Sequence, residues 1–242
     1  MIVLIGLDDT DNLESRGTGR LARALAADLG RDYGVLGVTR HQLLVDPRVP
    51  YTSHNSSAAI ALQAPQGTSL RDLFERVKGL MLADFQAGSD PGLCLAAHDS
   101  GELPPTGRLA CIPDEVVAFG RRAQSDLVAQ AEARALAARF GLLLEGLGGS
   151  QDGVIGALAA VGLAAGGQDG RYLLLGRIRE LSGLQPVAAV LETGITAVST
   201  LDGAPVEKGL VLSDKLRPAR RDGRPVQYVA WEEDHWAPLK LN

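Results

Sequence analysis

The chain opens with an apolar run that ends abruptly in carboxylates. Residues Ile2 to Leu7 are apolar and rich in branched side chains, which is typical of a β-strand buried on both faces. Asp8-Asp9-Thr10-Asp11 follow at once. Three carboxylates within four residues repel one another unless a cation or hydrogen-bond donors offset the repulsion. The start of the chain therefore predicts a buried strand with a concentration of negative charge at its end.

Two interpretations of this acidic turn are open. In open α/β sheets, ligands bind beyond the carboxyl ends of strands, and Mg²⁺ joins carboxylates to nucleotide phosphates. Asp8, Asp9 and Asp11 would then be metal ligands and catalytic residues. Because side chains alternate along a strand, Asp8 and Asp9 diverge unless the turn begins immediately. The alternative is a solvated turn in which an aspartate caps the next helix.

Two glycine-rich turns add to the first interpretation. Gly17-Thr18-Gly19 precedes a helix predicted from apolar residues at helical spacing, and Gly146 to Gly153 precedes a second one. Exposed backbone N–H groups and the helix dipole favour phosphate at such positions. Taken one at a time, both turns are weak signals: a role of Thr18 as helix N-cap is favoured at the first, and Asp152 as N-cap is the alternative at the second. As a pair beside the acidic turn they predict a nucleotide site, with binding residues Gly17, Gly19, Gly148, Gly149 and Gly153.

The pattern of elements predicts an α/β (or α+β) fold. Mixed strands and flanking helices alternate up to about residue 170, and mostly strands follow. Predicted helices are 70–82, 125–140 (N-capped by Ser125) and 154–165; predicted strands are 37–45, 58–62, 93–97, 142–144, 172–175, 187–191, 196–199 and 226–231. We expect an ATP-binding α/β region over 1–170 and a smaller β-rich region over 171–242.

Composition limits the kinds of partner. The 242 residues carry a formal net charge of −5, so a general positive field for nucleic acid is absent. Lys215, Arg217, Arg220, Arg221 and Arg224 surround the turn Asp222-Gly223 and either contact RNA phosphates or form a solvated hairpin. Two cysteines without a CxxC spacing and no membrane-length apolar run favour the cytoplasm.

The motifs together resemble a known family. Ile5-Gly6-Leu7-Asp8-Asp9-Thr10-Asp11 followed by Gly17-Thr18 is similar to the opening of the archaeal tRNA(Ile2) 2-agmatinylcytidine synthetases. Asn55 with Ala58-Ala59-Ile60, and the segment from Gly153 to Gly162, resemble two later motifs of that family. The similarity covers roughly residues 1 to 180.

The resemblance implies a kinase-like, ATP- and Mg²⁺-dependent ligase of tRNA processing. In that family, ATP activates the C2 carbonyl oxygen of an anticodon cytidine by phosphorylation, and agmatine displaces the phosphate. Its catalytic aspartates would fall on Asp8, Asp9 and Asp11, its phosphorylatable threonine on Thr18, and a cofactor-binding residue on Asn55.

The chain also departs from the family's pattern. The family carries an OB-fold and a cysteine-based zinc ribbon, and we expect this chain to be too short for both. Its two cysteines, Cys94 and Cys111, do not suffice for the zinc ribbon. We therefore expect ATP with an amine or another small-molecule acceptor, and tRNA bound weakly or with a partner protein. A nucleotide-binding regulatory module without catalysis is the alternative, and the three aspartates favour the enzyme.

Overall fold

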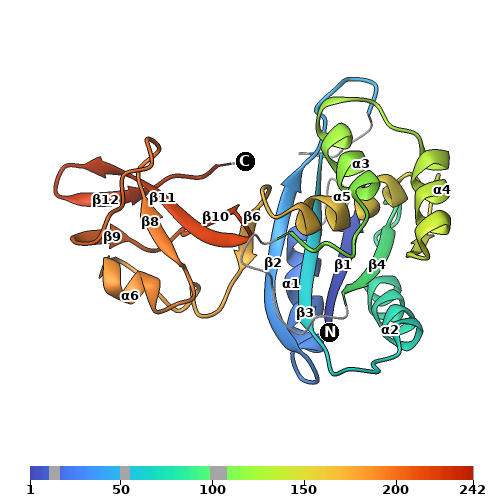
Figure 1. Cartoon of the computed structure of the whole chain (residues 1–242), viewed down its shortest axis with the longest axis horizontal. Coiled ribbons are helices and arrows are strands. Elements are labelled where there is room, and N and C mark those ends of the chain that lie inside the picture. The colour runs from blue at the N-terminus through green and yellow to red at the C-terminus, as the bar shows by residue number, and fades with distance from the viewer. Residues whose placement is uncertain (11–16, 50–54, 99–107, 242) are drawn as a thin grey trace.

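The structure is a computed structural model that describes residues 1–10, 17–49, 55–98 and 108–241. Two lobes lie side by side (Figure 1). The larger contains β1 (Ile2–Asp8), α1 (Thr18–Leu29), β2 (Gly34–Gln42), β3 (Ser56–Gln63), α2 (Leu70–Ala83), β4 (Gly92–His98), α3 (Asp114–Ser125), α4 (Gln130–Phe140), β5 (Leu143–Gly146) and α5 (Gly153–Gly166). The smaller follows from β6 (Arg171–Leu174), with β7 (Leu184–Pro186), α6 (Val187–Leu191), β8 (Ala197–Ser199), β9 (Leu210–Leu212), β10 (Ala219–Arg221), β11 (Arg224–Glu232) and β12 (His235–Pro238).

One mixed sheet runs through both lobes in the order β5-β4-β1-β3-β2-β6-β10-β11-β12-β9-β7, with β8 beside β11. The predicted fold class, a mixed sheet with flanking helices followed by a smaller β-rich region, is confirmed. Within the larger lobe every neighbouring pair of strands is antiparallel. The rule that ligands bind beyond the carboxyl ends of parallel strands therefore does not describe this sheet. Ends of several strands nevertheless lie together at one edge.

Strand β1 is buried on both faces, as its composition predicts. Ile2 and Leu4 belong to a core formed with α3 and α5, whereas Val3, Ile5 and Leu7 belong to a second core formed with α1 and α2. Because side chains alternate along the strand, one continuous apolar segment packs against helices on both faces of the sheet. This arrangement explains why the run is continuously apolar.

Helix α5 lies unusually close to the sheet because glycines face it. A Cβ atom built on Gly6 of β1 would lie 2.0 Å from the carbonyl oxygen of Ala157. One built on Gly92 of β4 would lie 2.0 Å from the carbonyl oxygen of Gly153. Real Cβ atoms cannot approach backbone so closely, and so only glycine allows this packing. Helices α3 and α4 contact α5 as well, which leaves most of α5 buried.

Two sequence predictions are wrong in the middle of the chain. Ser125 does not cap a helix over 125–140: it is the last residue of α3, and α4 begins at Gln130 after the extended residue Asp126. No glycine or proline marks this break, and the alanine-rich pattern runs across it. The segment Val187–Leu191 is a helix, not a strand; Pro186 directly precedes it and its two buried valines are three residues apart, a helical spacing.

The smaller lobe has a core of its own, which includes Val198, Val211 and Val229. Its hairpin between β10 and β11 turns at Asp222 and Gly223, which both have positive φ, as a two-residue turn requires. The division into regions 1–170 and 171–242 remains a proposal that these separate cores support. Over the described ranges, no helix combines the length and apolarity needed to cross a bilayer.

We predict that Gly6→Ala destabilises the fold. The new methyl group would press on the backbone of α5, and overpacking of this kind costs about 1–3 kcal/mol. Urea denaturation followed by circular dichroism measures the change. The matched control is Gly79→Ala on the exposed side of α2, where nothing lies within 4 Å; it should stabilise by roughly 0.5–1 kcal/mol. Equal effects of the two substitutions would contradict the close contact.

Candidate active site

The ends of five strands meet at one edge of the sheet in the larger lobe. Because the pairing is antiparallel, the edge collects the carboxyl ends of β1, β2 and β5 and the amino ends of β3 and β4. The first turns of α1 and α5 lie at the same edge. Residues that are far apart in sequence are thereby brought together.

A cavity of about 320 Å³ opens at this edge, within the usual size range of ligand sites. It is lined by Asp8, Asp9, Thr18, Leu43, Leu44, Arg48, Val49, Asn55, Ser56, Asp90, Ala123, Asp126, Leu127, Val128, Ala129, Gln130, Asp152, Gly153, Ile155 and Gly156. Five carboxylates and one guanidinium stand beside a group of apolar side chains. The cavity therefore has an apolar part and a strongly negative part.

The acidic turn begins immediately after β1. Strand β1 ends at Asp8, and Asp9 adopts a left-handed conformation with φ 48°, which aspartate tolerates better than most residues. The turn removes the alternation that would separate the two side chains, and both line the cavity. The carboxylate of Asp8 lies against the first turn of α5, where a Cβ on Gly156 would sit 1.8 Å from Asp8 Oδ2. The positive end of the helix dipole favours this carboxylate.

Asp90 connects the acidic turn to the second glycine-rich turn. Its backbone N–H donates to the carbonyl oxygen of Asp9 at 3.1 Å. Its carboxylate accepts hydrogen bonds from the backbone N–H of Ser150 at 3.0 Å and of Gln151 at 2.5 Å. The predicted neighbourhood of the turn at Gly148-Gly149 and the acidic turn is thus confirmed. Asp152 precedes α5 but makes no capping bond; its carboxylate accepts from Ser150 Oγ and Gln130 Nε2 instead.

Thr18 is the first residue of α1 and not its N-cap, a role taken by Gly17 at φ 78°. Its hydroxyl accepts hydrogen bonds from the backbone N–H of Thr10 at 3.4 Å and from Thr10 Oγ1 at 3.1 Å. Thr18 is buried and lines the cavity. Gly19 is not in the cavity lining and packs on Leu173 of β6.

The loop after β2 is pinned to the start of β3. Asn55 donates from Nδ2 to the carbonyl oxygen of Leu44 at 2.7 Å, so its amide nitrogen shapes the cavity wall. Arg48 binds Asp46 through Nε and Nη2, at 2.8 and 2.9 Å. These hydrogen bonds lower the pKa of Asp46 to about 2. Asp46 therefore remains charged and holds the Arg48 guanidinium at the cavity.

The residues present fit a divalent cation. The described residues contain no group of three metal-ligating side chains, and Asp11 lies outside them. However, Mg²⁺ commonly uses only one or two carboxylates and completes its shell with water and substrate phosphates. Asp8 and Asp9 can supply those carboxylates. The negative excess of the cavity also means that a polyphosphate requires a cation in order to enter.

The structure thus brings Asp8, Asp9, Thr18, Asn55 and Gly153 to one cavity. Gly149 packs against Asp90 of the cavity lining, whereas Gly148 packs against Phe85 and Pro91. Gly17 and Gly19 lie at the start of α1 but are not in its lining. Several lining groups were not predicted from the sequence, among them Asp90, Arg48, Gly156 and the α3–α4 linker. A signal existed for two of them: Asp90-Pro91 precedes an apolar strand, and a glycine inside an apolar helix indicates a close contact.

No family model and no curated protein sequence matches the chain. Its mixed α/β fold is shared by solved structures. The apo structure of TiaS, a tRNAIle2 agmatidine synthetase, matches with a TM-score of 0.53 at 21% identity over 67% of this chain and 35% of that chain. A tRNA fluorescent labeling enzyme and the TiaS-tRNA(Ile2)-ATP complex each match with a TM-score of 0.54 at 22% identity, over 67% of this chain and 36% of theirs.

The chain therefore spans about a third of the length of the solved structures it matches. At this identity the likeness establishes the fold alone. The resemblance to the tRNA(Ile2) 2-agmatinylcytidine synthetase family is confirmed at that level.

We predict that Gly156 is required for the position of Asp8. Gly156→Ala should destabilise the protein because its methyl group displaces the carboxylate, although alanine is the better helix former. In an Asp8→Ala background the same substitution should cost less, with a coupling of roughly 0.5–3 kcal/mol between the two sites. Denaturant unfolding of the four proteins completes the cycle. Additive effects would show that the two residues do not touch.

Proposed function

We propose that the chain is an ATP- and Mg²⁺-dependent phosphoryl-transfer enzyme that activates a carbonyl oxygen. The observation that carries this proposal is one cavity lined by Asp8 and Asp9 from β1, Thr18 from α1, and Gly153 and Gly156 from α5. Hard metal ligands, a hydroxyl and a helix N-terminus are the groups that phosphoryl transfer uses.

Each part of the cavity has a role in this proposal. Asp8 and Asp9 hold the metal ion, which neutralises phosphate charge. The positive end of the α5 dipole, at Gly153 in the cavity lining, favours the phosphates. The apolar side chains of Leu127 and Val128 face the base of the nucleotide, and the Arg48 guanidinium offers donors for an anionic oxygen. The buried Thr18 hydroxyl is held in position by the two hydrogen bonds that it accepts from Thr10.

The acceptor is proposed to be a cytidine carbonyl of tRNA or a related oxygen of a small molecule. Structures with the same fold are complexes of TiaS with tRNA and ATP, and with tRNA, AMPCPP and agmatine. The phosphoryl group would pass from ATP to the carbonyl oxygen as its bond to the bridging oxygen of the nucleotide breaks. An amine would then attack the adjoining carbon, lose a proton, and release the oxygen as inorganic phosphate.

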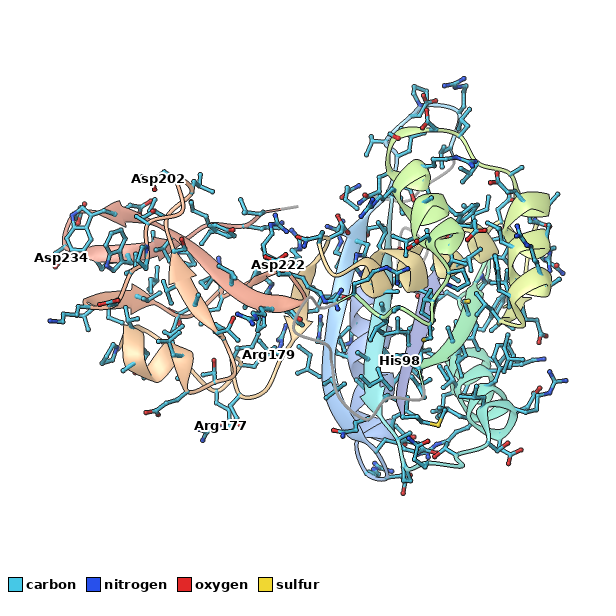
Figure 2. The ribbon with its side chains drawn as sticks, viewed as in Figure 1. His98, Arg177, Arg179, Asp202, Asp222 and Asp234 are labelled. Atoms are coloured by element: carbon cyan, nitrogen blue, oxygen red, sulfur yellow. The ribbon has the colours of Figure 1, made fainter. Side chains whose placement is uncertain are left out.

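We expect Asp8→Asn, Asp9→Asn and Asp11→Asn each to weaken Mg·ATP binding. Loss of a charged metal ligand costs about 1–3 kcal/mol, which isothermal titration calorimetry can measure. Asp234→Asn is the matched control, because this exposed carboxylate lies in the smaller lobe (Figure 2). Wild-type affinity in all three site variants would rule out the metal site.

The function itself is tested by ATP turnover with Mg²⁺, measured alone and with tRNA, agmatine and other amines. We expect turnover that depends on an acceptor and is lost in Asp8→Asn. Tight Mg·ATP binding without turnover under every condition would instead indicate a nucleotide-binding regulatory module.

A further inference from the structure

Cationic side chains gather where the two lobes meet. We call them the cation track: Arg23 on α1, Arg40 on β2, Arg171 on β6, Arg179 in the turn after β6, Arg217 before β10, and Lys240 near the C-terminus. Figure 2 places Arg179 at the junction of the lobes. Six separate segments of chain therefore contribute to one positively charged surface.

Backbone pairing holds these cations together. Arg40 and Arg171 are direct partners across β2 and β6, and Arg171 also faces Ala219 of β10. Arg179 Nε donates to the carbonyl oxygen of Leu173 at 3.1 Å. A like-charged pair directly opposite in a sheet is destabilising, and so the fold keeps this pair at a cost in stability.

The electrostatic effect of the crowding is seen in the pKa values. Burial, and then the charges of Arg40 and Arg217, lower the pKa of Arg171 to about 10. The charge of Arg171, followed by burial, lowers the pKa of Lys240. Burial and then the charges of Arg179, Arg217 and Arg20 lower that of Arg23. Every charged neighbour that shifts these three groups is itself a cation.

Five of the six cations of the track have no carboxylate partner among the described residues. Within the described part of the chain, no ion pair joins a carboxylate to Arg23, Arg40, Arg179, Arg217 or Lys240. Elsewhere such pairs are common: Arg76 binds Asp28 and Asp32 at 2.7 Å. Arg40 instead donates to neutral partners, among them Ser56 Oγ at 2.9 Å. In a protein of net charge −5, five such cations gathered on one surface favour the binding of an external anion.

The track begins at the candidate active site. Ser56, the hydrogen-bond partner of Arg40, lines the cavity together with Asp8. From there the cations continue across β6 to Arg217 and Lys240 in the smaller lobe. A single small anion would touch only a few of them, whereas a chain of phosphates can follow them all.

We propose that the cation track binds the phosphodiester backbone of an RNA strand and leads it to the cavity. The choice of RNA as the polyanion rests on the proposed function, in which a nucleobase is one of the acceptors. Because backbone contacts carry no sequence information, the binding is non-specific, with Kd of roughly 10⁻⁴–10⁻⁶ M at physiological salt.

The hairpin at Asp222-Gly223 contributes fewer cations to the track than its sequence indicates. Arg220 is buried and donates to the carbonyl oxygen of Ala164. Arg221 donates to the carbonyl oxygens of Arg220 and Gln168. Of the five cations around this turn, only Arg217 belongs to the track.

The test is fluorescence anisotropy of a labelled single-stranded RNA titrated with protein over a range of salt, without ATP. Arg179→Gln/Lys240→Gln removes two exposed cations from the track. The slope of log K against log salt should fall by about 1.4, since each contact to a single strand contributes about 0.7. The control Arg71→Gln/Arg121→Gln removes the same charge from exposed positions on α2 and α3 and should leave the slope unchanged.

Equal losses in the two double variants, or no RNA binding by the wild type, would overturn the inference. So would displacement of RNA by inorganic phosphate or by polyglutamate at the same charge concentration, which would indicate a small anion or an acidic protein. Calorimetry with Mg·ATP on the same variants separates the two proposals. Track-dependent RNA binding without ATP turnover would contradict the proposed function alone, and turnover on small acceptors without RNA binding would contradict the track alone.

Discussion

The close contact between α5 and the sheet is the constraint on which the larger lobe depends. Gly6, Gly92 and Gly153 let the helix backbone approach the strands at a distance that any side chain would prevent. That approach places the positive end of α5 against Asp8. At position 156 only glycine fits beside the Asp8 carboxylate. Packing, electrostatics and the candidate chemistry thus share one interface, and a change there affects all three.

Charge is distributed over the molecule in two opposed regions. The cavity has an excess of carboxylates, which by itself would repel the phosphates of a nucleotide. The cation track, beginning with Arg40 at the cavity rim, is the reverse, with cations held together by β-pairing. A weakly acidic net charge conceals both features, because it averages over them. Each region concentrates charge of one sign, negative in the cavity and positive in the cation track.

Much of this organisation could be predicted from the sequence where a local pattern determined it. The run Ile2 to Leu7, the helix after Gly17 and the apolar helix from Gly153 all have unambiguous periodicity or composition. The break between α3 and α4 could not be found, because Asp126 leaves the helix without a glycine or proline to mark it. Asp90 was also missed, since its importance arises from hydrogen bonds to Ser150, which is sixty residues away. Side chains gathered by topology carry no local signal.

The two ends of the strands in the antiparallel sheet of the larger lobe differ in what they carry. All the candidate chemistry lies at the edge where β1 ends, whereas the connection from β3 to α2 turns at the opposite edge, where the backbone N–H and the hydroxyl of Thr68 both donate to the carbonyl oxygen of Pro65. Gly67 in this turn is exposed and has open space around it. Such a turn can accept an inserted peptide, a fluorophore or a fused domain without reaching the cavity. The architecture therefore permits an insertion in the turn between β3 and α2 without a change in the geometry of the edge that carries the cavity.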